Sequence, residues 1–169
     1  CRQEEIPWYI VGNGSNLLVA DEGVRGVVIQ LLRNFNQIQV EGCQIRMQAG
    51  AQNAAVAKRA LDASLTGFEF AAGIPGTIGG AVVMNAGAYG GEMKQVLTCV
   101  RILFPEEGVK TLTNEELKLG YRHSILSECP EAVVLSATMR LRPDKEKTIR
   151  DTMRELMRKR KGSQPLEWP

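Results

Sequence analysis

The chain has 169 residues, of which 44% are hydrophobic and 24% charged, proportions that are ordinary for a soluble globular protein. Its 21 basic and 19 acidic side chains leave a net charge of +2, which gives no electrostatic case for binding nucleic acid. Four scattered cysteines and a single histidine, His123, exclude a zinc site of the usual spacing, so we expect no metal. Scattered cysteines without a signal peptide favour the reducing cytoplasm.

Strands and helices are predicted in mixed order. Apolar or alternating runs predict strands at 8–11, 17–20, 27–31, 38–40, 45–47, 96–104, 109–112 and 132–141. Two pairs of these runs, 38–40 with 45–47 and 96–104 with 109–112, indicate hairpins. Few connections have the length of a parallel crossover, so the sequence predicts an α+β fold, not a doubly wound α/β fold.

The predicted helices differ in length and in the signals that begin them. A helix over 53–62 is predicted with Asn53 as its cap, and a helical turn at 82–84. Thr113 and Glu116 have the spacing of a capping box and predict the start of a short helix. The last helix is predicted over 144–161, with an apolar face formed by Ile149, Met153, Leu156 and Met157.

The first of two glycine-rich loops runs over residues 12–16, between two apolar runs. It begins like a dinucleotide-binding fingerprint, but Leu17 stands where that pattern has its third glycine, and a strand, not a helix, is predicted next. No Lys-Ser/Thr pair follows a glycine loop as a phosphate-binding loop of the Walker type requires. Its amides could converge on an anion, or the loop could be the turn of a plain hairpin.

The second glycine-rich segment runs from Gly73 to Gly90. The uncharged stretch around it is about long enough to cross a bilayer, but its proline, asparagine and many glycines make insertion unfavourable, so we expect no membrane contact. Pro75 could occupy the first turn of a helix and leave the amides of Gly76 and Thr77 for an anion. Close packing of a helix on a sheet is the alternative. Two amide-rich loops together predict a large cofactor held at two places.

Three strings in this order resemble bacterial UDP-N-acetylenolpyruvoylglucosamine reductases: residues 12–19, residues 73–90, and Tyr121-Arg122-His123-Ser124. The resemblance covers essentially the whole chain. It implies the two-lobed α+β module of vanillyl-alcohol-oxidase-type flavoenzymes, with FAD held non-covalently and reduced by NADPH. It also implies hydride transfer to the enolpyruvyl group of a UDP-sugar, giving UDP-N-acetylmuramate for peptidoglycan synthesis.

The resemblance places the FAD-binding residues in the two glycine loops. They are Gly12, Asn13, Gly14, Ser15, Asn16, Gly73, Ile74, Pro75, Gly76, Thr77, Gly79, Gly80, Ala81, Asn85, Gly87, Ala88, Tyr89 and Gly90. Tyr89 is expected to pack on the cofactor, with a core tyrosine as the alternative.

Arg122 is the expected catalytic residue, and Tyr121 and Arg122 are expected to bind substrate, because the resemblance puts this arginine near the flavin and the substrate carboxylate. A permanently charged guanidinium can stabilise the negative charge that hydride addition moves into a carboxylate. A surface arginine in a turn is the alternative. We expect a structural role for His123 and a turn for Ser124.

The chain departs from the family pattern at its end, where Gln164 to Pro169 is the last segment. The family's proton-donor serine and its glutamate lie in a further domain, and no residue here is assigned to either role. We expect a fragment truncated at both ends and inactive by itself. Its predicted division is the end of a first lobe (1–31), a second lobe (32–161) and the start of a substrate domain (162–169).

Two other functions fit the same loops: the FAD-binding module of another oxidoreductase, or a flavin-binding fragment without turnover. Basic residues between 154 and 161 could contact RNA or a UDP pyrophosphate, but their spacing favours a solvated helix face. The sequence indicates no oligomeric state.

Overall fold

The computed structural model describes residues 1–164, so most of the predicted third segment lies outside the described residues. The predicted α+β fold is confirmed, because most strands pair in antiparallel fashion and helices are interspersed among them. The division at residues 31 and 32 stays a prediction.

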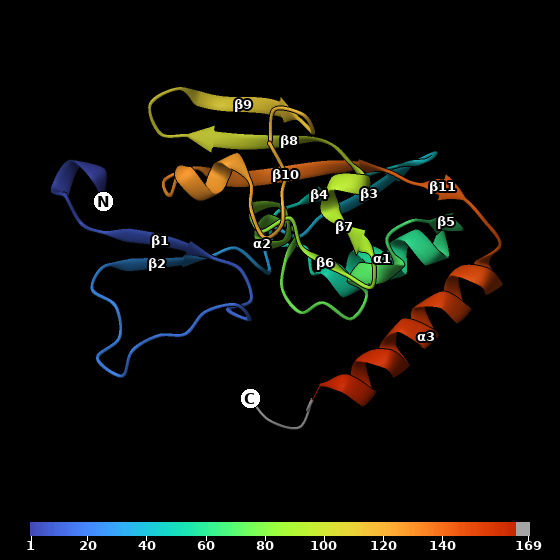
Figure 1. Cartoon of the computed structure of the whole chain (residues 1–169). Helices are drawn as coiled ribbons and strands as arrows, with labels where there is room; N and C mark the ends of the chain where they lie inside the picture. The colour runs from blue at the N-terminus through green and yellow to red at the C-terminus, as the bar shows by residue number, and fades with distance from the viewer. Residues whose placement is uncertain (165–169) are drawn as a thin grey trace.

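A five-stranded antiparallel sheet is the framework of the molecule (Figure 1). Its strands, in spatial order, are β3 (Ile38–Glu41), β4 (Gln44–Gln48), β10 (Val133–Arg140), β8 (Leu97–Phe104) and β9 (Gly108–Thr113). Both predicted hairpins are confirmed, as β3 with β4 and β8 with β9. Register places Ala137 beside Met47 on one side and Val100 on the other, and all three are buried in the core.

Two helices pack against this sheet. The first, α1 (Asn53–Asp62), follows β4, and the second, α2 (Ile78–Val83), packs on β10 and β4. Alternate residues of β4, Ile45 and Met47, are fully buried, as the period of a half-buried strand requires. Small residues on α1, including Ala57 and Ala60, let that helix approach closely.

A separate parallel pair, β1 (Trp8–Val11) with β2 (Val27–Gln30), lies to one side of the main sheet (Figure 1). Every residue of β2 is exposed, which is unusual because parallel strands are normally covered on both faces. Short elements complete the described chain: β5 (Leu65–Thr66), β6 (Gly87–Ala88), β7 (Gly91–Glu92), β11 (Arg142–Pro143) and the 3₁₀ turns η1 (Arg2–Glu4), η2 (Glu69–Ala71), η3 (Met93–Gln95) and η4 (Ile125–Glu128).

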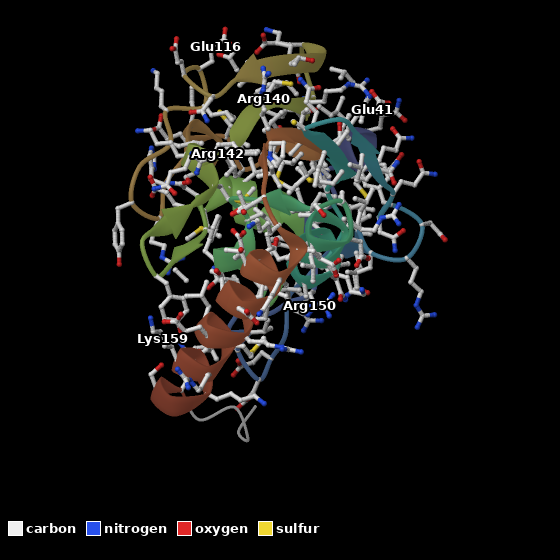
Figure 2. The ribbon with its side chains drawn as sticks, turned by 90° about the vertical axis from the view of Figure 1, so that its right-hand side faces the viewer. Glu41, Glu116, Arg140, Arg142, Arg150 and Lys159 are labelled. Carbon is white, nitrogen blue, oxygen red and sulfur yellow. The ribbon has the colours of Figure 1, made fainter. Side chains whose placement is uncertain are left out.

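The long helix α3 (Glu146–Ser163) runs away from the sheet along the lower right of Figure 1. Its apolar face is as predicted: Ile149 is buried, and Met153, Leu156 and Met157 are partly buried. The helix contacts η2 and α1. Its charged residues are exposed except Arg160, and Arg150 and Lys159 are labelled along it in Figure 2.

Three local predictions were wrong. Residues 17–20 form no strand, because they lie exposed without a partner strand, and Leu18 is fully exposed. Thr113 and Glu116 make the bonds of a capping box, but they close a single turn that does not continue as a helix. The cap of α1 is Gln52, because Asn53 already belongs to the helix and its side chain bonds elsewhere.

Candidate cofactor cleft

A cleft of about 1040 Å³ lies between the first glycine loop, α2 and the segment from Leu126 to Val134. Pockets for drug-sized ligands have volumes of roughly 300–1,000 Å³, so this cleft has room for a larger one. Among its lining residues the charged side chains are Arg122 and Arg160, and none is acidic. The cleft therefore favours a large ligand that carries negative charge.

The first wall is the loop over residues 12–16, which follows β1. None of its backbone N–H groups donates to an acceptor within residues 1–164, whereas the N–H of Leu17 donates to the carbonyl of Gly14 at 3.2 Å. A Cβ on Gly12 would lie 2.2 Å from Oγ1 of Thr77, so the loop touches the opposite wall where it has no side chain. Successive free amides of this kind form an anion-binding concavity.

The second wall begins with residues 74–77. Gly76 has a φ of +113°, which only glycine adopts readily, and a Cβ there would meet Oγ of Ser15 at 3.0 Å. The N–H groups of Gly76 and Thr77 have no acceptor in the described part of the chain. The placement of Pro75 in the first helical turn was wrong, because the helix starts only after Thr77.

The start of α2 is fixed by the end of β4. The N–H groups of Ile78 and Gly79 donate to the carbonyls of Ala51 and Ala49, at 2.9 and 2.8 Å. A Cβ on Gly79 would lie 3.1 Å from Cβ of Ala49, so this glycine serves close packing of the helix on the sheet. A Cβ on Gly80 would meet nothing within 4 Å, although Gly80 lines the cleft. The Cβ direction of Gly79 therefore faces the sheet, whereas that of Gly80 faces open space.

Asn53 provides a buried polar group at the cleft and is only 2% exposed. Its Nδ2 donates to the carbonyl of Ile74 at 3.3 Å, which fixes the orientation of the amide because a carbonyl only accepts. Its Oδ1 has no partner among the described residues. Buried polar atoms are nearly always paired, so this oxygen can accept a bond from a hydroxyl or N–H of a ligand. Free amides and an unpaired acceptor fit a dinucleotide with phosphates and hydroxyls.

A tight turn presents Arg122 to the cleft. The N–H of Gly120 donates to the carbonyl of His123 at 3.0 Å, and the reciprocal bond is 3.2 Å, so Tyr121 and Arg122 form the turn between them. Arg122 has a φ of +54°, an uncommon conformation for a residue with a side chain. Tyr121 is 90% exposed, and Nε2 of His123 lies 3.6 Å from Oε1 of Glu128.

Two buried side chains anchor this turn to the glycine segment. Nδ2 of Asn85 donates to the carbonyl of Gly120 at 2.9 Å, and Oγ of Ser124 donates to the carbonyl of Val83 at 2.7 Å. Both side chains are 3% exposed or less. The Arg122 turn is thereby attached to the segment that follows α2.

The structure brings most of the expected cofactor-binding residues into the one cleft. Those that line it are Gly12, Asn13, Gly14, Ser15, Asn16, Ile74, Pro75, Gly76, Thr77, Gly79, Gly80, Ala81, Gly87, Ala88 and Tyr89. Asn85, Gly90 and Tyr121 instead line an adjoining hollow of about 250 Å³, which shares Gly87, Ala88, Tyr89 and Arg122 with the cleft. Gly73 lines neither and lies against α3. Their roles stay predictions.

Sequence reasoning missed Asn53, Ser127, Cys129 and Arg160, which also line the cleft. No pattern marks the first three, because neighbouring residues do not show which way a side chain faces.

Within residues 1–164 no group of three or more histidine, cysteine or acidic side chains could hold a metal ion. No helix in the same part of the chain is long and apolar enough to cross a membrane.

Relatives of known name match the chain along its whole length. UDP-N-acetylenolpyruvoylglucosamine reductase of Caldanaerobacter subterraneus subsp. tengcongensis is 51% identical over 168 residues, covering 99% of this chain and 55% of the relative. The enzyme of the same name from Syntrophomonas wolfei is 47% identical over 169 residues, covering 100% and 56%. The chain therefore spans about 55% of the length of the curated relatives it matches. The resemblance drawn from the three sequence strings is confirmed.

Solved structures also resemble this chain in fold. UDP-N-acetylenolpyruvylglucosamine reductase from Thermus caldophilus is 38% identical and superposes with a TM-score of 0.84, covering 97% of this chain and 59% of the other. Alkyldihydroxyacetonephosphate synthase, at 16% identity and a TM-score of 0.56 over 83% of this chain and 28% of its own, shares the fold alone. This likeness bears out the predicted fold class. The family model described as "FAD binding domain" matches residues 1–113, and the chain belongs to this family of FAD-binding domains.

Proposed function

We propose that this chain is the FAD-binding part of an NADPH-dependent reductase that acts on the enolpyruvyl group of UDP-N-acetylglucosamine enolpyruvate and forms UDP-N-acetylmuramate. The similarity to reductases of that name, 51% in one case, supports the substrate. The observation that carries the proposal is that one cleft joins two rows of free amides to the arginine turn. Free amides can hold the phosphates of a dinucleotide, and an arginine in the same cleft can stabilise negative charge on a substrate carboxylate.

FAD, when bound, would accept a hydride from NADPH and deliver it to the enolpyruvyl double bond. The amides of the loop over residues 12–16 and of Gly76 and Thr77 would hold its phosphates. Oδ1 of Asn53 would accept a hydrogen bond from one of its hydroxyl or N–H groups. Gly80 keeps space in the cleft, because no neighbouring atom lies within 4 Å of the position a Cβ would take.

Arg122 would act on the substrate, not on the cofactor. When a hydride adds to the methylene carbon of the enol ether, negative charge moves into the adjacent carboxylate before a proton reaches the neighbouring carbon. A guanidinium held in a rigid turn stabilises that charge without reorganising. Tyr121, exposed beside it with its ring centroid 6.0 Å from Cζ of Arg122, is available to a substrate.

The proposal includes a small UDP-sugar as the substrate, a cytoplasmic location and a role in peptidoglycan synthesis. All four cysteines are free, which supports a reducing compartment.

The test is a spectrum of the purified full-length protein followed by two mixing experiments. We expect flavin absorbance, bleaching by NADPH, and recovery of the oxidised spectrum when the enolpyruvyl UDP-sugar is added. A yellow protein that NADPH does not bleach would indicate a flavin-binding module without turnover. Bleaching that the enolpyruvyl sugar does not reverse would indicate a different oxidoreductase, and a colourless protein that does not take up added FAD would overturn the proposal.

A further inference from the structure

Arg160, in the last turn of α3, lines the same cleft as the two glycine loops. Its aliphatic stem lies flat against the glycine segment, because a Cβ on Gly73 would come within 3.1 Å of Cδ of Arg160 and 3.7 Å of Cε of Met157. The side chain is partly buried, although it belongs to a helix whose other basic residues are exposed. The absence of a side chain at Gly73 is thus what lets this arginine reach the cleft.

The guanidinium of Arg160 has no acidic partner in the described part of the chain. Two of its basic neighbours on α3 are paired, since Nζ of Lys159 lies 2.6 Å from Oε1 of Glu155 and Nη1 of Arg154 lies 3.9 Å from Oδ1 of Asp151. Arg160 takes part in no ion pair within residues 1–164. Lys159 lies on the exposed surface of the helix (Figure 2). An unpaired guanidinium in a cleft without acidic lining residues raises the affinity of that cleft for an anion.

The position of Arg160 relative to the free amides indicates which anion it binds. Gly73, which its stem contacts, lies three residues before Gly76, and a Cβ on Gly76 would lie 3.0 Å from Oγ of Ser15 in the first loop. Arg160 therefore lies against the segment that also carries Gly76, and it lines the same cleft as both amide-bearing loops. Arg122 enters the cleft from a separate turn, attached to the end of α2 through Asn85.

We propose that Arg160 binds the diphosphate of the dinucleotide in this cleft, together with the free amides of the two loops. A guanidinium matches phosphate oxygens in geometry and charge and forms paired hydrogen bonds with them. The inference rests on the proposed function because it takes the dinucleotide to be FAD. The diphosphate of a nucleotide-sugar substrate could bind Arg160 in the same way. We favour the diphosphate of the cofactor because Arg160 contacts Gly73, in the same segment as the free amide of Gly76.

The test compares Arg160→Gln with Arg154→Gln in the full-length protein stripped of flavin. Both changes remove one positive charge from α3, but Arg154 does not line the cleft. Dissociation constants are measured by flavin fluorescence for FAD and for riboflavin, which has the same ring and no phosphate. We expect Arg160→Gln to raise the dissociation constant for FAD by about tenfold or more, which is the effect of losing a hydrogen bond to a charged group. The affinity of Arg160→Gln for riboflavin should not change, and Arg154→Gln should have little effect on the affinity for FAD. Arg160→Lys, which keeps the positive charge, should bind FAD more tightly than Arg160→Gln does.

Other results would overturn the inference. Equal weakening of FAD and riboflavin would mean that Arg160 supports the fold of the cleft and contacts no phosphate. Unchanged FAD affinity together with a raised KM for the UDP-sugar would assign Arg160 to the diphosphate of the substrate. Failure of the unaltered protein to bind either flavin would instead refute the proposed function, which keeps the two failures distinct.

Discussion

Nδ2 of Asn85 lies 2.9 Å from the carbonyl oxygen of Gly120, and this bond joins the glycine segment to the turn that carries Arg122. The same Nδ2 donates to Oε2 of Glu92 at 3.0 Å, and Oδ1 accepts from the N–H of Lys94 at 2.9 Å. Asn85 has a φ of +40°, a conformation that asparagine tolerates better than most residues. One buried amide thus fixes three segments.

Asn85→Ala in the full-length protein should lower the free energy of unfolding by roughly 1–3 kcal/mol, because it leaves buried groups without partners. It should also slow reduction of the enolpyruvyl substrate, because the Arg122 turn loses its attachment. Urea unfolding and stopped-flow absorbance measure the two effects.

Asn114→Ala is the matched control for this prediction. Nδ2 of Asn114 also donates to two carbonyls, those of Lys94 and Leu97 at 2.7 Å each, but these bonds do not involve the turn. Its substitution should cost stability without slowing the reaction of the remaining folded protein. Equal slowing by both changes would refute a specific link between Asn85 and Arg122.

Arg122→Ala should leave FAD bound and slow reoxidation of the reduced flavin by the substrate by about 10²–10³-fold, or roughly 3–4 kcal/mol of lost charge stabilisation. Reduction by NADPH should change much less, because it moves no charge into a substrate carboxylate. Single-turnover absorbance separates the two half-reactions. Reoxidation at the unaltered rate would remove Arg122 from the mechanism.

Gly12→Ala and Gly80→Ala should both weaken the binding of FAD, but for different reasons. A Cβ on Gly12 would collide with Oγ1 of Thr77 at 2.2 Å, so this change should lower both stability and FAD affinity. A Cβ on Gly80 meets nothing within 4 Å, so this change should raise stability by about 0.5–1 kcal/mol while a methyl group takes up space in the cleft. Thermal unfolding and FAD titration test both. Undiminished FAD affinity in Gly80→Ala would show that no ligand lies over α2.

The pKa of Glu116 should lie below its ordinary value of 4.5, because the carboxylate accepts hydrogen bonds first from the backbone N–H and then from the hydroxyl of Thr113. A lowered pKa in the folded state contributes stability that is present above pH 4.5 and is lost as pH falls through the folded value. Carboxyl resonances followed by NMR against pH give the value. Thr113→Val should raise it only in part, because the backbone bond remains; a fully restored value would assign the shift to the hydroxyl alone.

Elements with a clear period were predictable from sequence, and elements defined by distant contacts were not. The range of α1 over residues 53–62 was correct because its apolar positions repeat at helical spacing. The run at 17–20 has the composition of a strand, but a strand exists only where a partner supplies hydrogen bonds, and none adjoins it in the described chain.

The same limit applies to the cleft. Glycine spacing marked both amide-bearing loops, because close backbone approach demands glycine locally. Arg160 resembled its solvated neighbours, because its access to the cleft depends on Gly73, a residue far from it in the chain. The charge of a side chain can be predicted from sequence, but the segment that it reaches is set by tertiary packing.

The parallel pair of β1 and β2 meets the rest of the molecule through the loop over residues 12–16, which touches Thr77, and through Leu31, whose carbonyl lies close to Gly50. A molecule in the cleft would contact both the loop over residues 12–16 and α2, and would therefore add contacts between the β1–β2 pair and the main sheet. Amide protons of Tyr9 to Val11 should exchange with solvent more slowly when the cleft is filled, because Ile10 and Val11 of β1 line the cleft.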